Sequence, residues 1–187
     1  MTQVEQIKEL VAKNADTTVA LAKEIWGYAE LSYEEFKSSA ALIKALKAEG
    51  FEVEEGIAEM PTAFKASFKC GSGKPVIGLL AEYDALSGLS QKAASPKQEA
   101  IEPGGSGHGC GHNLIGAGCY AAAVALKEYF TAHSIDGTVA FFGCPAEEGA
   151  GSKQFIARAG YFDDVDFAYT WHPATVNEVG SKGSVAI

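Results

Sequence analysis

Residues 76–81 form a continuous apolar run, VIGLLA, and this run constrains the fold more than any other feature of the chain. An apolar stretch of this length between polar residues is typical of a strand that is buried on both faces, as in a parallel sheet. The segments GTVAFFGCP (137–145) and DFAYTWHP (166–173) have the same character. We therefore expect three buried strands in one sheet.

Helical patterns precede and separate these strands. The first fifty residues contain three amphipathic stretches, and Ser32 followed by Glu35 predicts a capping box at the start of the third. A long stretch from Asn113 to about His133 is rich in glycine and alanine, which predicts a helix lying close against the sheet, with Asn113 as its cap. Strands that alternate with helices predict an α/β domain with a largely parallel central sheet.

Charge and hydropathy exclude two classes of partner. The 187-residue chain has a net charge of −9 and no cluster of lysine or arginine, so we expect no nucleic-acid partner. Its N-terminus is polar, and no apolar run is long enough for a signal peptide or a membrane span. The four scattered cysteines show no disulfide pattern. We expect a cytoplasmic protein with reduced thiols and no membrane partner.

Reactive side chains follow each of the three predicted strands. Glu82 and Asp84 come after the first, Glu147 and Glu148 after the second, and His172 ends the third. In open α/β sheets, binding sites form outside the carboxyl ends of the strands. We therefore expect these side chains to gather at one edge of the sheet.

The stretch SGHGCGHNLIG places Cys110 and His112 just before the long helix. Residues two apart in an extended segment point to the same side, so both can reach one ion. Taken singly, these residues have simpler interpretations: Cys110 as a small buried side chain, Glu147 and Glu148 as a solvated pair, and His172 as a strand-end residue. Their joint placement favours a site for zinc or another divalent transition metal.

Four motifs, in order along the whole chain, resemble those of the aminoacylase and carboxypeptidase family of dinuclear metallopeptidases. They are EYDALSGLSQ, GHGCGHNLIG, GCPAEEGAGSK and FDDVDFAYTWHP. The resemblance implies a three-layer αβα catalytic domain like that of zinc exopeptidases. We expect residues 1–187 to be part of this domain, incomplete on its C-terminal side, because the family's lid or dimerisation domain and its last histidine ligand have no counterpart here.

The resemblance also implies roles for individual residues and a cofactor of two divalent ions, zinc or manganese. The implied metal ligands are Cys110, His112, Glu148 and His172. Glu147 would be the general base, and Asp84 would support a metal ligand without binding the metal itself. Glu82 stands where many relatives have a histidine ligand, which leaves its role open, and His108 is not among the implied ligands.

The implied activity is metal-dependent hydrolysis of an amide bond. Its substrate would be a small molecule: an N-acyl amino acid, a dipeptide or a compound like p-aminobenzoyl-glutamate. We expect the chain alone to be weakly active or inactive, with either a second copy or a complementary C-terminal half as its partner. Two alternatives stay open: a non-catalytic fragment that binds metal or a partner, and a thiol enzyme that uses Cys110.

Overall fold

The computed structural model describes residues 1–149 and 151–176. The helices are α1 (Gln3–Lys13), α2 (Ala15–Tyr28), α3 (Phe36–Ala48), the 3-10 helix η1 (Ile57–Glu59), α4 (His112–His133) and α5 (Ser152–Arg158). The strands are β1 (Glu52–Glu55), β2 (Phe64–Cys70), β3 (Val76–Ala81), β4 (Gly137–Gly143) and β5 (Phe167–Tyr169). Within the described ranges, every helix is too short or too polar to cross a bilayer.

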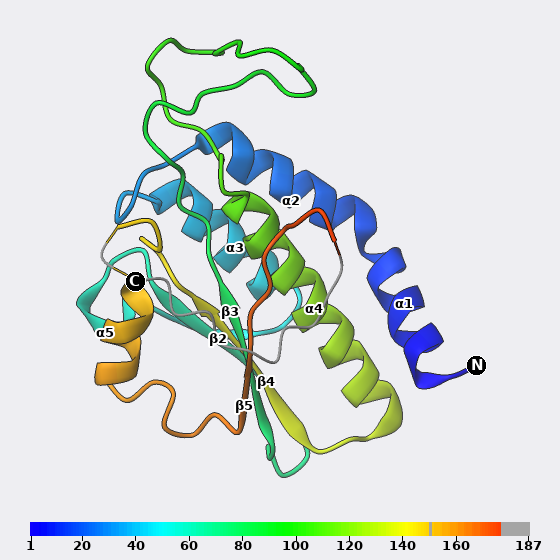
Figure 1. The fold of residues 1–187 in the computed structure, drawn as a ribbon. Coiled ribbons are helices and arrows are strands. Elements are labelled where there is room, and N and C mark those ends of the chain that lie inside the picture. Colours follow the sequence, from blue (N-terminus) through cyan, green and yellow to red (C-terminus); the bar gives the residue numbers. More distant parts are fainter. Residues whose placement is uncertain (150, 177–187) are drawn as a thin grey trace.

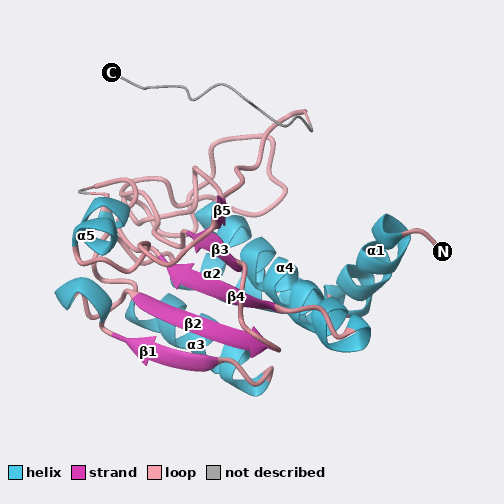
Figure 2. Cartoon of the chain, turned by 90° about the horizontal axis from the view of Figure 1, so that it is seen from below, coloured by secondary structure: helices cyan, strands magenta, loops and turns pink. Residues whose placement is uncertain are grey.

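The five strands form one sheet in the order β1-β2-β4-β3-β5 (Figure 2). The strands β3, β4 and β5 run parallel to one another, which confirms the parallel arrangement expected for the three apolar runs. The strands β1 and β2 pair antiparallel with their neighbours, so the complete sheet is mixed. The parallel part carries the candidate site residues, because its strand ends meet at a single edge.

Side chains of β4 alternate between two apolar clusters, one on each face of the sheet. Val139 and Phe141 are fully buried in the cluster formed with α1, α2, α3 and α4. Ala140 and Phe142 belong to the cluster on the opposite face, which includes residues of η1 and α5. Helices therefore cover both faces, as expected for a three-layer α/β domain; α4 and α5 lie apart in Figure 1.

The third predicted strand, β5, differs from expectation in its burial. All three of its residues are exposed, with Phe167 at 53% and Tyr169 at 57% of full exposure. The strand pairs with β3 and lies at the end of the sheet, with no further strand beside it in the described part of the chain. The prediction of a buried strand was wrong here, because an apolar sequence does not show whether a strand has neighbours on both sides.

The predicted capping box at Ser32 and Glu35 is also wrong. The helix α3 begins at Phe36, and Glu35 precedes it without a side-chain cap. The buried Glu35 carboxylate instead accepts hydrogen bonds from the Thr62 hydroxyl at 3.0 Å and from the Ala146 N–H at 2.8 Å. These partners lie far away in the sequence, so tertiary contacts replace the local bonds of a capping box.

The long helix α4 begins one residue earlier than predicted, at His112. Gly111 precedes it with a φ of 83°, a left-handed conformation that favours glycine. Asn113 lies inside the helix and donates a hydrogen bond to the Ala22 carbonyl at 3.1 Å. Asn113 therefore links α4 to α2, and the prediction that it caps α4 is wrong.

A long irregular segment separates β3 from α4. An antiparallel bridge between Leu86 and Gly107 closes its base, and the Ser90 N–H donates to the Gly105 carbonyl at 3.0 Å. The segment projects beyond α2 at the top of Figure 1. The bridge therefore places Gly107, three residues before Cys110, beside Leu86, which lies shortly after β3.

Candidate metal centre

Two carboxylates follow β3 and point to the same side of the sheet. Successive side chains alternate along a strand, so Glu82 and Asp84 share one side while Tyr83 takes the other. Tyr83 is buried in the core, and its hydroxyl donates to the Thr62 carbonyl at 2.6 Å. Core packing of the intervening tyrosine therefore fixes the direction of both acidic side chains.

His112, in the first turn of α4, lies at the centre of these groups. Its Nδ1 is 2.7 Å from Asp84 Oδ1, and both side chains are buried. A carboxylate only accepts, so Nδ1 carries a hydrogen, and in the neutral imidazole Nε2 keeps a lone pair. Nε2 is buried and makes no hydrogen bond within the described part of the chain. Its neighbours are carboxylate oxygens of Glu82 at 3.3 Å, Glu147 at 3.7 Å and Glu148 at 3.8 Å.

This arrangement calls for a positive charge beside His112 Nε2. A buried lone pair surrounded by carboxylate oxygens is electrostatically unfavourable unless a proton or a cation lies among them. Burial alone would lower the pKa of His112, but the Asp84 hydrogen bond and the surrounding carboxylates outweigh it and raise the pKa. A buried imidazole nitrogen that faces several carboxylate oxygens fits a divalent metal ion.

Cys110 and His172 form a second group of donors with His112. The Cys110 Sγ is 3.2 Å from His172 Nε2, and His172 Nδ1 donates to the Pro173 carbonyl at 3.0 Å. Donor atoms of Cys110, His112 and His172 all lie within 4.8 Å of one another. The left-handed turn at Gly111 shows that the predicted extended segment is wrong, although the turn still brings Cys110 and His112 together. Sulfur and two imidazole nitrogens suit zinc.

Asp84 connects three segments of the chain. Besides His112, its carboxylate accepts hydrogen bonds at Oδ2 from the Glu148 N–H at 2.9 Å and from the Ser32 hydroxyl at 3.2 Å. Burial acts to raise the pKa of Asp84, but the bonds from His112 and Glu148 prevail and lower it. Asp84 therefore stays ionised and holds both His112 and the backbone of Glu148 in place.

The environment of Cys110 does not suit a nucleophilic thiol. Burial, and then the Glu148 carboxylate, raise the pKa of the Cys110 thiol to about 11. A catalytic cysteine needs a lowered pKa, so that the thiolate is present at neutral pH. The contact with His172 resembles a thiol–imidazole pair, but the surrounding acidic groups oppose ionisation. The surroundings of Cys110 therefore do not favour a thiolate nucleophile.

Two further residues bear on the site in different ways. His108 lies outside the cluster, where its Nε2 donates to the Ile25 carbonyl at 3.1 Å and burial lowers its pKa. Lys153, in the first turn of α5, forms an ion pair with Glu82 Oε1. The sequence gives no sign of this role, because a lysine at the start of a short helix normally points into solvent.

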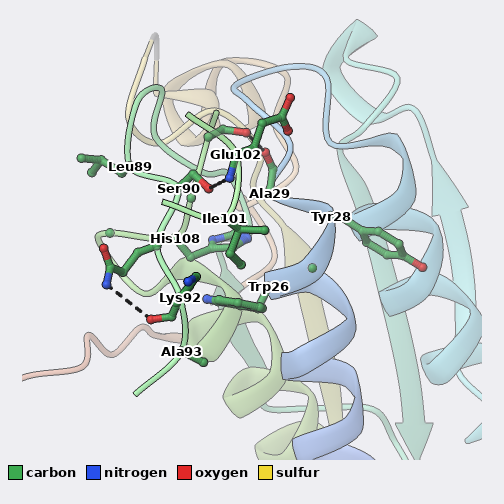
Figure 3. A pocket seen from close by; sticks show the side chains of 15 residues that line it. Trp26, Tyr28, Ala29, Leu89, Ser90, Lys92, Ala93, Ile101, Glu102 and His108 are labelled. Atoms are coloured by element: carbon green, nitrogen blue, oxygen red, sulfur yellow. Dashed lines mark hydrogen bonds between the residues drawn. The ribbon is translucent and has the colours of Figure 1, made fainter. Parts of the chain in front are cut away.

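Two hollows lie beside the long segment that separates β3 from α4. One of about 380 Å³ lies between the end of α2 and residues 89–109, lined by Trp26, Lys92, Ile101 and His108 among others (Figure 3). None of the six predicted site residues lines it. A second hollow, of about 350 Å³, reaches Glu148 and is walled by apolar Leu31 and Leu86 and by Ser32. The second hollow therefore gives a ligand access to Glu148.

The family model described as Peptidase family M20/M25/M40 matches residues 78–185, more than half of the chain. The chain belongs to this family. The M20 assignment agrees with the resemblance of the four motifs. Among curated relatives, a subunit of the p-aminobenzoyl-glutamate hydrolase of Escherichia coli is 51% identical over 153 residues, which are 82% of this chain and 31% of that protein. The N-acetyl-L-cysteine deacetylase of Bacillus subtilis is 32% identical, over 88% of this chain and 38% of that protein.

Solved M20 structures have the same fold. A dinuclear metal binding peptidase of Bacillus subtilis superposes with a TM-score of 0.71 at 24% identity, covering 89% of this chain and 44% of that one. The aminobenzoyl-glutamate utilization protein of Klebsiella pneumoniae gives 0.68 at 19% identity, over 91% of this chain and 46% of that one. The chain thus spans less than half the length of these relatives and has the fold of the part that it matches.

Proposed function

We propose that the protein containing this chain hydrolyses an amide bond with the help of two divalent metal ions. The observation that carries the proposal is the buried Nε2 of His112, which has no hydrogen-bond partner among the described residues, faces three carboxylates and lies beside Cys110 and His172. Membership of the M20 family and the relatives that hydrolyse or deacetylate amides support it.

The residues that would hold the ions are those implied by the motifs: Cys110, His112, Glu148 and His172. Divalent cations supply Lewis acidity, which polarises an amide carbonyl and makes a water molecule more acidic. Zinc and manganese are both compatible with these donors, since sulfur and imidazole favour zinc and carboxylates favour manganese.

Glu147 is the residue that we assign to proton transfer. Its side chain is 43% exposed, in contrast to the buried His112, and its Oε2 lies 3.7 Å from His112 Nε2. It can therefore reach both the site and an incoming substrate. Glu147 would accept a proton from the attacking water and deliver it to the amine nitrogen that leaves. Glu148 cannot share this task while its oxygens serve as metal ligands.

Asp84 would act as a positioning residue. Its bond to Nδ1 fixes the tautomer of His112, so that Nε2 presents its lone pair to the site. Its bond to the Glu148 N–H fixes the loop after β4, which carries both glutamates. One buried carboxylate thus sets the relative positions of a predicted ligand and of the predicted base.

The substrate would be a small molecule with an amide bond. The similarity to the p-aminobenzoyl-glutamate hydrolase favours a p-aminobenzoyl-glutamate-like compound, and the similarity to the deacetylase favours an N-acyl amino acid; a dipeptide also fits this class. The hollow beside Glu148 combines apolar walls with the Ser32 hydroxyl, a combination that is common in small-molecule sites.

We also propose a partner and a location. The relative from Escherichia coli is a subunit of a hydrolase, which supports a second polypeptide, either another copy of this chain or a complementary C-terminal half. The net charge of −9 and the absence of a basic cluster in the sequence argue against a nucleic-acid partner. A cytoplasmic location remains our proposal from the scattered, unpaired cysteines.

The test is hydrolysis of p-aminobenzoyl-glutamate and of N-acetyl amino acids by the protein before and after chelation. We expect activity to disappear with the chelator and to return with zinc or manganese. The assay is repeated with a second copy of the chain and with a complementary C-terminal half. If the protein binds these metals at Cys110 and His112 but releases no amine in either case, it is a non-catalytic metal-binding fragment. Hydrolysis that survives complete removal of metal would contradict the proposal.

A further inference from the structure

Among the described residues, Glu82 has the carboxylate that lies nearest to His112 Nε2. Its side chain is 9% exposed, and its Oε2 lies 3.3 Å from this nitrogen. The tautomer set by Asp84 leaves a lone pair on Nε2, so two electron-rich atoms face each other across this distance. Such a pair is stable only with a positive charge between or beside the two atoms.

Lys153 distinguishes the two oxygens of Glu82. Its ammonium binds Oε1, while Oε2 is the oxygen nearest to His112. The lysine side chain is 29% exposed and comes from α5, on the opposite face of the sheet from α4. The ion pair therefore fixes the rotation of the Glu82 carboxylate and directs one oxygen towards the site.

The number of donor atoms available to the two metal ions also bears on the role of Glu82. The four ligands implied by the motifs must serve two ions, and zinc in proteins is typically bound by about three or four side chains, so the centre needs further donors from this chain or from the rest of the protein. The single lone pair of His112 Nε2 can bind only one ion. Donor atoms of Glu82, His112 and Glu147 lie within 4.8 Å of one another, in a group that shares His112 with the Cys110 group.

We propose that Glu82 is a further metal ligand, binding one of the two cations through Oε2, and that Lys153 is the positioning residue that orients it. The inference rests on the proposed function, since it assigns a residue to the same metal centre. Glu82 adds an oxygen donor to the group that it forms with His112 and Glu147. Oxygen donors suit manganese better than sulfur does, so the loss of Glu82 should affect manganese binding more than zinc binding.

A purely structural ion pair is the competing explanation. In that case Glu82 and Lys153 would contribute to folding stability, and their replacement would leave the metal affinity unchanged. Removing one partner of a buried pair destabilises a protein because it leaves an unpaired charge, whereas removing both is often tolerated. The double variant Glu82→Gln/Lys153→Met therefore separates metal binding from folding.

The experiment is a titration of the metal-free protein with manganese and with zinc, followed by calorimetry and, for manganese, by electron paramagnetic resonance. We expect Glu82→Gln and the double variant to weaken manganese binding by about 10-fold or more, with a smaller effect on zinc. Lys153→Met should weaken manganese binding by several-fold, and Lys153→Arg should restore it. The control is Lys74→Met, which breaks the exposed Lys74–Asp166 pair on another part of the surface.

Manganese affinity and spectrum that match the wild type in both Glu82→Gln and the double variant would overturn the inference. The same holds if Lys153→Met matches Lys74→Met in metal affinity, or if the wild type binds no manganese. The proposed function fails separately, through hydrolysis that does not need metal. Metal-dependent hydrolysis with unchanged affinity in the Glu82 variants would remove only the present inference.

Discussion

Asp84 Oδ1 accepts a hydrogen bond from His112 Nδ1 at 2.7 Å, in a buried contact between the end of β3 and the first turn of α4. This single contact determines which nitrogen of the imidazole faces the other candidate ligands. Through this contact, an acidic residue with no access to solvent orients His112 within the candidate metal centre. The chemistry of the site therefore depends on a pair of residues separated by 28 positions in the sequence.

Replacing Asp84 by asparagine tests this dependence. The amide can accept one bond but places an NH₂ group against either His112 Nδ1–H or the Glu148 N–H, each of which is a donor. We expect metal affinity to fall by about 10- to 100-fold, as measured by competition with a chelating indicator. Ser32→Ala removes a third bond to the same carboxylate and should have a much smaller effect. Equal losses in the two variants would show that Asp84 does not act through His112.

Replacing Glu147 by glutamine removes the proposed base and keeps the shape of the side chain. We expect the turnover of an amide substrate by the metal-loaded protein to fall by about 10²- to 10⁴-fold. Metal content, measured by elemental analysis, should stay at the wild-type level, because Glu147 is not among the proposed ligands. Near-normal turnover with full metal content would assign proton transfer to another group.

The buried carboxyl of Glu35 should make folding stability depend on pH. Burial raises its pKa above the ordinary value of 4.5, although bonds from the Ala146 N–H and the Thr62 hydroxyl oppose the shift. A carboxyl with a raised pKa in the folded state stabilises the fold below the unfolded pKa and loses this contribution as pH rises through the folded value. Wild-type stability should therefore decline above about pH 4.5 relative to Glu35→Gln.

Urea unfolding of the wild type and of Glu35→Gln across about pH 4 to pH 8 measures this difference. Glutamine can accept from the Ala146 N–H and donate to the Thr62 hydroxyl, so the variant should fold. A stability difference that is independent of pH would show that Glu35 keeps the same protonation in both states.

Gly118 on α4 provides a test of how the fold holds His172. A Cβ at this position would lie 2.5 Å from a ring carbon of Trp171, the residue before His172. Gly118→Ala should displace the indole, change tryptophan fluorescence and weaken metal binding by several-fold. In α2, Gly27 has no described atom within 4 Å of the same added carbon, so Gly27→Ala should raise helix stability by about 0.5–1 kcal/mol. Similar metal affinities in both variants would show that Trp171 does not position His172.

Much of the site could be predicted because its residues follow elements with strong sequence patterns. The apolar runs of β3 and β4 predicted parallel strands, and the carboxyl ends of parallel strands meet at one edge. Glu82, Asp84, Glu147 and Glu148 therefore had to lie near one another. The motif around Cys110 and the family resemblance supplied the remaining candidate ligands.

Errors arose where a local pattern competes with a distant partner. Ser32 and Glu35 have the spacing of a capping box, yet Ser32 bonds to Asp84 and Glu35 to Thr62 and Ala146. The strand β5 has an apolar sequence but lies at an open edge, because burial depends on neighbours that the strand's own sequence does not encode.

The sequence by itself determined the order of strands and helices, the side of the sheet on which the reactive groups gather and the chemical types of donor present. Only the tertiary structure decided which nitrogen of His112 is free, which oxygen of Glu82 is bound by Lys153 and how Asp84 joins three segments. Hydropathy and residue spacing are properties of the sequence, so the elements that they specify can be predicted from it. Hydrogen-bond direction and side-chain rotation are set by atoms from distant segments, which become neighbours only when the core packs.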